Sequence, residues 1–309
     1  MTRSAERGLD GIFLAAKRIM LANASLFVPP LIFPWAAALW WLLVSVGAGL
    51  VAALFARGAL GALAAVVLGA LGTVLALLVA GGFMAGWGEM VARAAGTGRC
   101  TVWDFFLGLA QHTWRFATGM ATIGLCLAGL GLLWAMGLYV AHQLPPLVFG
   151  PFAARWHLVA IAGMFWLVCG IVFVLFASMW QPAAVVDRLG GRHAVAQSFA
   201  FVRRHWPTVG AILATSLFAH GVLAAAAYVT KLPIDVIAFA ATRSTTAGLA
   251  FFTGLVVLEL YLIAWAALAT FFKLAQFIAY IDLSAEPAPA TAGVAPHSAR
   301  SQSAAQAGV

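Results

Sequence analysis

The sequence predicts an all-α fold, a polytopic membrane helical bundle with six transmembrane helices. Two observations lead to this prediction: the composition and the spacing of the charged residues. Of the 309 residues, 64% are hydrophobic and 8% are charged, and the mean hydropathy is +1.02. A soluble domain usually carries about a quarter charged residues. Water therefore cannot be the main solvent of this chain.

Charge-free stretches give the number of spans. The stretches without Asp, Glu, Lys or Arg are 19–56, 58–88, 116–154, 156–186 and 205–230, and 244–272 is interrupted only by Glu259. A helix that crosses a bilayer needs about 20 mostly apolar residues. Because backbone groups facing lipid must pair within their own segment, we expect each stretch to be a helix.

The elements are expected in the following order. Residues 1–24 carry apolar residues at helical spacing and predict a short amphipathic helix on the inner leaflet. The transmembrane domain covers 25–283, with spans at roughly 31–54, 59–83, 116–140, 157–179, 208–228 and 246–271. Similar short amphipathic helices are expected in the links before the third and fifth spans. Residues 284–309 are rich in Ala, Pro, Ser and Gln and predict a disordered cytoplasmic tail.

Local patterns refine these elements. Pro29, Pro30 and Pro34 stand near the start of the first span, where a missing N–H costs least. Glu89 and Arg93 are one helical turn apart and predict an ion pair rather than a site. A turn is expected at 96–98. Gly82 and Gly86 have the spacing that allows close contact between helices.

Basic residues indicate the orientation. With a cytoplasmic N-terminus, thirteen Lys and Arg lie on the inside and four on the outside. Cytoplasmic loops of membrane proteins carry such an excess of basic residues. Both termini are therefore expected in the cytoplasm, and the expected location is the inner membrane of a bacterium. The net charge of +8 follows from this bias, so no nucleic acid is expected as a partner.

The three cytoplasmic pieces resemble one another at offsets of 94 and 93 residues. Residues that coincide at these offsets are Asp10, Asp104 and Gln197, and also Arg18, His112 and His205. The pattern suggests three repeated hairpin units, each with its own surface helix. Similar amphipathic composition in three equivalent places is the alternative explanation.

Known catalytic motifs are missing from the sequence, so a membrane enzyme of a known motif class is not expected, and no cofactor or metal is expected. Glu259 is the one acidic residue deep in a span, and an intramembrane carboxylate suggests proton or cation transport. His220 and Tyr261 are its candidate partners. The alternative is that Glu259 stays protonated or bonds to a neighbouring helix.

A second polar set lies in the link before the fifth span. Its members are Asp187, Arg188, Arg192, His193, Arg203, Arg204 and His205. Anionic lipid headgroups or a membrane protein partner are the expected contacts of this set. The alternative is that these charges only satisfy the inside bias, with Asp187 capping or pairing locally.

The segment from Trp180 to Trp206 resembles a motif of bacterial six-span proteins. These are the membrane domain joined to some glycerophosphoryl diester phosphodiesterases, together with its stand-alone relatives. The matching elements are Pro182, Val185, Val186, Asp187, Gly190, Gly191, Ala194, Ser198, Arg203, Arg204 and Trp206. The 309 residues contain no phosphodiesterase domain, so that activity is not expected.

Three functions follow as hypotheses. The first is a non-catalytic scaffold or accessory protein that contacts anionic lipid or a partner protein. The second is a small transporter or permease-like component that uses Glu259. The third, an enzyme acting on lipid, has no catalytic constellation to support it.

Overall fold

The computed structural model describes residues 8–55, 59–143, 152–241 and 247–285, and these form helices joined by short turns. Their order and bounds are α1 (Leu9–Ala22), the 3-10 helix η1 (Ala24–Phe27), α2 (Val28–Phe55), α3 (Ala59–Thr97), α4 (Val102–Gln143), α6 (Phe152–Ala177), α7 (Trp180–Val186), α8 (Gly191–Arg204), α9 (Trp206–Ala241) and α10 (Ala247–Ser284). Six helices of the described chain are long and apolar enough to span a membrane. The predicted all-α, multi-pass membrane fold is confirmed.

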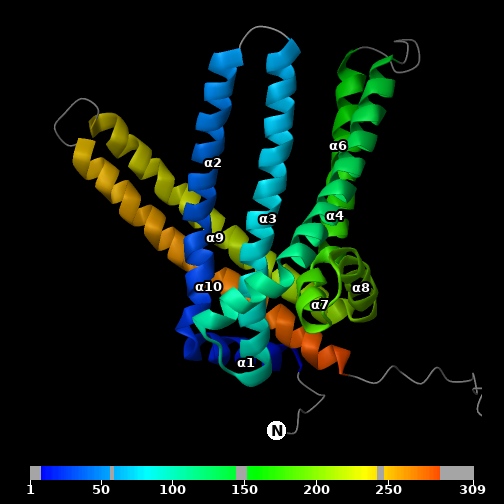
Figure 1. The fold of residues 1–309 in the computed structure, drawn as a ribbon, viewed down its shortest axis with the longest axis vertical. Helices are drawn as coiled ribbons and strands as arrows, with labels where there is room; N and C mark the ends of the chain where they lie inside the picture. Colours follow the sequence, from blue (N-terminus) through cyan, green and yellow to red (C-terminus); the bar gives the residue numbers. More distant parts are fainter. Residues whose placement is uncertain (1–7, 56–58, 144–151, 242–246, 286–309) are drawn as a thin grey trace, which may run out of the picture.

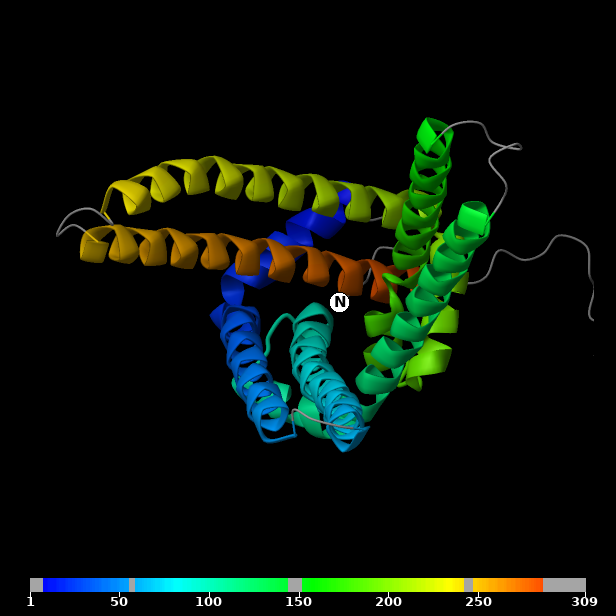
Figure 2. The same ribbon diagram turned by 90° about the horizontal axis from the view of Figure 1, so that it is seen from above.

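The long helices form three hairpins, α2 with α3, α4 with α6, and α9 with α10 (Figure 1). The hairpins diverge from a common base, and α1, α7 and α8 lie in this base (Figures 1 and 2). In the membrane, lipid tails are as apolar as the helices, so no hydrophobic force draws the hairpins together. The divergent arrangement therefore leaves large apolar side chains exposed along the spans, as a lipid-facing surface requires.

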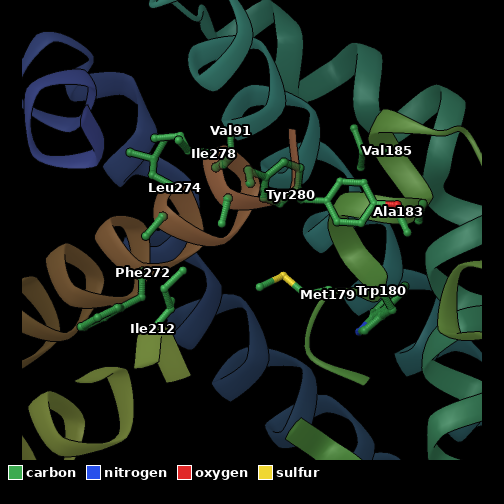
Figure 3. Close-up of a cluster of buried hydrophobic side chains, with 14 of the residues drawn as sticks. Val91, Met179, Trp180, Ala183, Val185, Ile212, Phe272, Leu274, Ile278 and Tyr280 are labelled. Atoms are coloured by element: carbon green, nitrogen blue, oxygen red, sulfur yellow. The ribbon is translucent and has the colours of Figure 1, made fainter. Parts of the chain in front are cut away.

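The base holds a continuous hydrophobic core (Figure 3). Its centre is the last third of α10, where Leu274, Phe277 and Tyr280 are fully buried. Residues of α3, α7 and α9 pack around this segment, among them Val91, Ala183 and Ile212. The core thus joins all three hairpins at one end.

Glycines allow α3 and α4 to approach closely. A Cβ at Gly86 would lie 2.6 Å from the Phe105 ring, and one at Gly108 would lie 2.7 Å from the carbonyl oxygen of Ala85. A Cβ at Gly82 would meet the Thr113 hydroxyl at 3.2 Å. The close contact predicted from Gly82 and Gly86 is confirmed.

The predicted N-terminal helix is present as α1, and it packs on α10; its contact with the inner leaflet stays a prediction. Ile12 and Ala16 are buried, and the Phe13 ring contacts the rings of Phe271 (tilted) and Phe272 (edge-to-face) of α10 at centroid distances of 5.6 and 6.3 Å. Lys17 and Arg18 face outward. The apolar face of α1 covers α10 because α10 is apolar all round and its end would otherwise be exposed in the base.

Several helices extend beyond the predicted spans. Helix α3 continues to Thr97 and α10 to Ser284, and residues 102–115 belong to α4 instead of forming a separate surface helix. Each of these helices is longer than its expected span because its additional residues pack on other helices in the base. The Gly96–Gly98 turn is confirmed, since Gly98 has a φ of 81° and its N–H bonds to the Ala94 carbonyl at 2.8 Å.

The proposed repeat would make the three hairpins equivalent units. Superposition of the three units stays a prediction. The predicted tail lies outside the described residues beyond position 285.

Substitutions at two adjacent glycines, Gly190 and Gly191, can test the packing of α8 on α4. A Cβ at Gly191 would lie 2.2 Å from the backbone nitrogen of Gly119 and 2.5 Å from the carbonyl oxygen of Arg115. Gly191→Ala should therefore destabilise the protein by about 3 kcal/mol, because backbone must move to make room. The measurement is the melting temperature of the purified chain in mild detergent.

Gly190→Ala is the control, since a Cβ at Gly190 meets nothing within 4 Å and its φ of −66° suits alanine. Equal melting temperatures for the two variants would contradict the described contact between α8 and α4.

Candidate functional site

A charged network joins α3 to the start of α4 in the base. Glu89 pairs with Arg93 at 3.0 Å and with Nε2 of His112 at 3.4 Å, and Arg93 also contacts Asp104 at 3.3 Å. Asp104 accepts a hydrogen bond from the backbone N–H of Thr101 at 2.8 Å, which caps α4. The predicted ion pair of Glu89 and Arg93 is confirmed, and the network serves to fasten two helices.

Asn23 lies between α1 and η1, and its side chain connects this turn to the link between α3 and α4. Its side-chain amide donates to the carbonyl oxygen of Gly98 at 3.0 Å, and its oxygen accepts from the N–H of Cys100 at 2.9 Å. Burial raises the pKa of the Cys100 thiol, so this thiol is a weak nucleophile at neutral pH. These contacts hold the base together.

Ser198 bridges the break between α6 and α7. Its hydroxyl donates to the carbonyl oxygen of Phe176 at 2.7 Å and accepts from the N–H of Met179 at 3.0 Å. A helix break leaves such backbone groups without partners, and burial would make that costly. Sequence reasoning did not assign this role, although Ser198 stood within the recognised motif.

The structure divides the predicted polar set between the two ends of α8. Arg188, Arg192 and His193 lie at its start, and Arg203 and Arg204 lie in its last turn, all five exposed. Because α8 has 14 residues, its ends are about 20 Å apart. The set therefore forms two basic surfaces instead of a single cluster.

Asp187 and His205 of the same set have structural contacts. Asp187 accepts a hydrogen bond from the hydroxyl of Tyr280, which fixes the turn after α7 to the end of α10. The His205 ring contacts the Phe201 ring in a tilted arrangement, with a centroid distance of 4.8 Å. Local pairing of Asp187, the alternative to a binding role, agrees with this geometry.

The intramembrane candidates do not meet. Glu259 is partly buried in α10 and makes no hydrogen bond or ion pair within the described residues. Tyr261 is two positions further on, and such residues do not face each other on a helix. His220 bonds through Nδ1 to the carbonyl oxygen of Ser216 in its own helix at 2.7 Å.

Lys273 is a buried basic residue. The sequence analysis counted it only among the thirteen Lys and Arg expected on the cytoplasmic side. Its side chain is 6% exposed, and Nζ lies 3.9 Å from the centre of the Trp87 ring. Such a contact stabilises a desolvated ammonium group. Within the described residues Nζ makes no hydrogen bond. The apolar core around Trp87 is thus attached to α10 through this cation.

An apolar groove of about 990 Å³ opens between α6 and α9. Its walls include Trp166, Gly170 and Leu175 of α6, and Trp206 and Leu217 of α9. Leu127 of α4 also contributes to the wall. The sequence analysis did not single out these residues, because apolar and small residues of this kind occur in every membrane helix.

Comparisons of the chain with protein-family models, with curated proteins and with solved structures found no match. In the described part of the chain, no three His, Cys, Asp or Glu residues are grouped so that they could hold a metal ion. The geometry of the base and of the groove is therefore the basis for assigning a function.

Ser198→Ala tests the bridge at the helix break. The variant should lose about 1–3 kcal/mol of stability, because the buried N–H of Met179 would have no partner. The measurement is the melting temperature in mild detergent. Ser178→Ala serves as the matched control, since the buried Ser178 hydroxyl makes no hydrogen bond within the described residues. A larger loss for Ser178→Ala than for Ser198→Ala would refute the bridging role.

Proposed function

We propose that the protein is a non-catalytic scaffold of a bacterial inner membrane. In this proposal the base faces the cytoplasm and its exposed basic side chains bind anionic lipid. The observation that carries the proposal is the division of polar residues in the base. Polar side chains such as Asn23 and Ser198 are engaged in structural contacts, whereas Arg203 and Arg204 are exposed and make none within the described residues.

The arrangement of the helices supports the proposed orientation. Helix α1 and the end of α10 both lie in the base, and six helices lead away from it and back (Figure 1). The base also contains most basic residues of the described chain, among them Lys17, Arg18, Arg192, Arg203 and Arg204. A cytoplasmic membrane surface with anionic lipid attracts basic segments by about 1 kcal/mol for each Lys or Arg.

The resemblance to the membrane domain of some phosphodiesterases fits an accessory role. In such proteins the catalytic chemistry belongs to a separate soluble domain. We propose that the chain has a comparable supporting role, with membrane lipid as its first partner and a membrane protein as a further partner.

Neutralising the base tests this function. The quadruple variant Lys17→Gln, Arg18→Gln, Arg203→Gln and Arg204→Gln should lose most of its enrichment of anionic lipid, about tenfold or more, because four attractive charges are removed. The measurement is the ratio of phosphatidylglycerol to phosphatidylcholine retained on the protein, by native mass spectrometry, after equilibration in equimolar vesicles of the two lipids.

The control is Lys231→Gln, which removes a basic residue from α9 beyond the base. The proposal is wrong if the wild-type protein shows no enrichment of phosphatidylglycerol, or if the quadruple variant retains the same ratio as the wild type.

Transport is the second candidate function, and it is favoured by the Glu259 carboxylate in α10, which has no hydrogen-bond or ion-pair partner among the described residues. Under the scaffold function, Glu259→Gln should fold as the wild type does, with an equal or higher melting temperature, because glutamine carries no charge into lipid. Proteoliposomes of both proteins should show the same background proton flux. A solute-dependent proton flux that Glu259→Gln abolishes would instead support a transporter.

A further inference from the structure

The groove between α6 and α9 has the depth of one membrane leaflet. Along α9 its lining runs from Trp206 to His220, a rise of about 21 Å. One leaflet of the hydrocarbon core is about 15 Å thick, and the headgroup region adds several ångströms. The groove can therefore accommodate an acyl chain from its carbonyl end to the bilayer centre.

The groove also has the size and the lining of a ligand site. Its volume of about 990 Å³ is at the upper end of the usual range for small-molecule pockets, about 300–1,000 Å³. Apolar residues form most of the wall, and Ser216 and His220 are polar residues at the end of the lining farthest from Trp206. Small residues such as Gly170 and Gly210 widen it. An acyl chain fits an apolar lining of this kind.

Two exposed arginines come shortly before the first groove residues of α9 in the sequence. Arg203 and Arg204 end α8, and Trp206 and Pro207, which follow after one residue, already line the groove. The turn is held in place, because Val209 N–H bonds to the His205 carbonyl at 3.1 Å and the Trp206 ring stacks on Phe176 at 5.9 Å. The two arginines thus adjoin the end of the apolar groove that begins at Trp206.

We propose that this groove binds one anionic phospholipid of the leaflet next to the base. Its acyl chain lies between α6 and α9, and its phosphate contacts Arg203 and Arg204. The inference rests on the proposed function and adds to it a defined site. Charge complementarity selects the occupant, because an acyl chain alone matches the wall and only an anionic headgroup also matches the two arginines.

The test uses the full chain and a phosphatidylglycerol with a photoactivatable group on its acyl chain, in phosphatidylcholine vesicles. In the wild-type protein, labelled peptides should come mainly from α6 and α9. Gly170→Phe should reduce this labelling about tenfold, because the new ring fills the groove and a Cβ at this position meets nothing within 4 Å. Gly221→Phe is the control, since Gly221 has the same open surroundings in α9 but does not line the groove.

A second pair of variants, at Leu217 and Phe218, distinguishes loss of lipid binding from a folding defect. Leu217 and Phe218 are both 73% exposed, and only Leu217 lines the groove. Leu217→Trp should reduce labelling, and Phe218→Trp should leave it unchanged. Arg203→Gln with Arg204→Gln should reduce labelling by phosphatidylglycerol about tenfold more than Lys17→Gln with Arg18→Gln, the basic pair on α1.

The outcomes separate the inference from the proposed function. Retention of phosphatidylglycerol that depends on Arg203 and Arg204 but not on Gly170 and Leu217 would overturn the groove site and leave the scaffold function intact. Equal retention of the two lipids by the wild-type protein would reject both. A wild-type dimer that Gly170→Phe dissociates would assign the groove to a second copy and overturn the lipid assignment.

Discussion

Burial of the last third of α10 is the interaction on which the rest of the structure depends. The hairpins diverge, so lipid surrounds most of their length, and lipid provides no hydrophobic force for their association. Only in the base do α1, α3, α7 and α9 meet a shared apolar segment. Leu274, Phe277 and Tyr280 supply that segment, and each is fully buried. The first and third hairpins pack directly against this helix end, and the second hairpin is joined to it through α3 and α7.

Polar contacts in the base then determine where each helix begins and ends. Ser198 holds the break between α6 and α7, and Asn23 holds the first turn of the chain to the link after α3. The Tyr280 hydroxyl connects the end of α10 with the turn after α7. Each of these bonds joins elements that are distant in the sequence, so each restricts the base to one arrangement. The charged network of Glu89 has the same effect on α3 and α4.

Hydropathy predicted the six spans, because a stretch of apolar residues long enough to cross a bilayer has few other stable structures. It could not predict that α3 and α10 continue beyond the expected spans, since the ends of these helices pack on other helices in the base. Nor could it distinguish the groove, whose leucines and glycines resemble those of every other span. Arg203 and Arg204 were recognised from their charge, but their position next to Trp206 and the groove depends on how α8 meets α9.

Helix α8 connects the two parts of the molecule that a lipid would contact. Its buried face carries Ser198, which fixes the end of α6, and its last turn carries Arg203 and Arg204, which precede α9. One wall of the groove, α6, is therefore attached to the middle of α8, and the other wall, α9, follows the C-terminal end of α8. A ligand that filled the groove and bound the arginines would contact α6, α8 and α9 together. Occupancy of the groove would therefore stabilise the spacing between the second and third hairpins, which is the property that the proposed membrane scaffold requires.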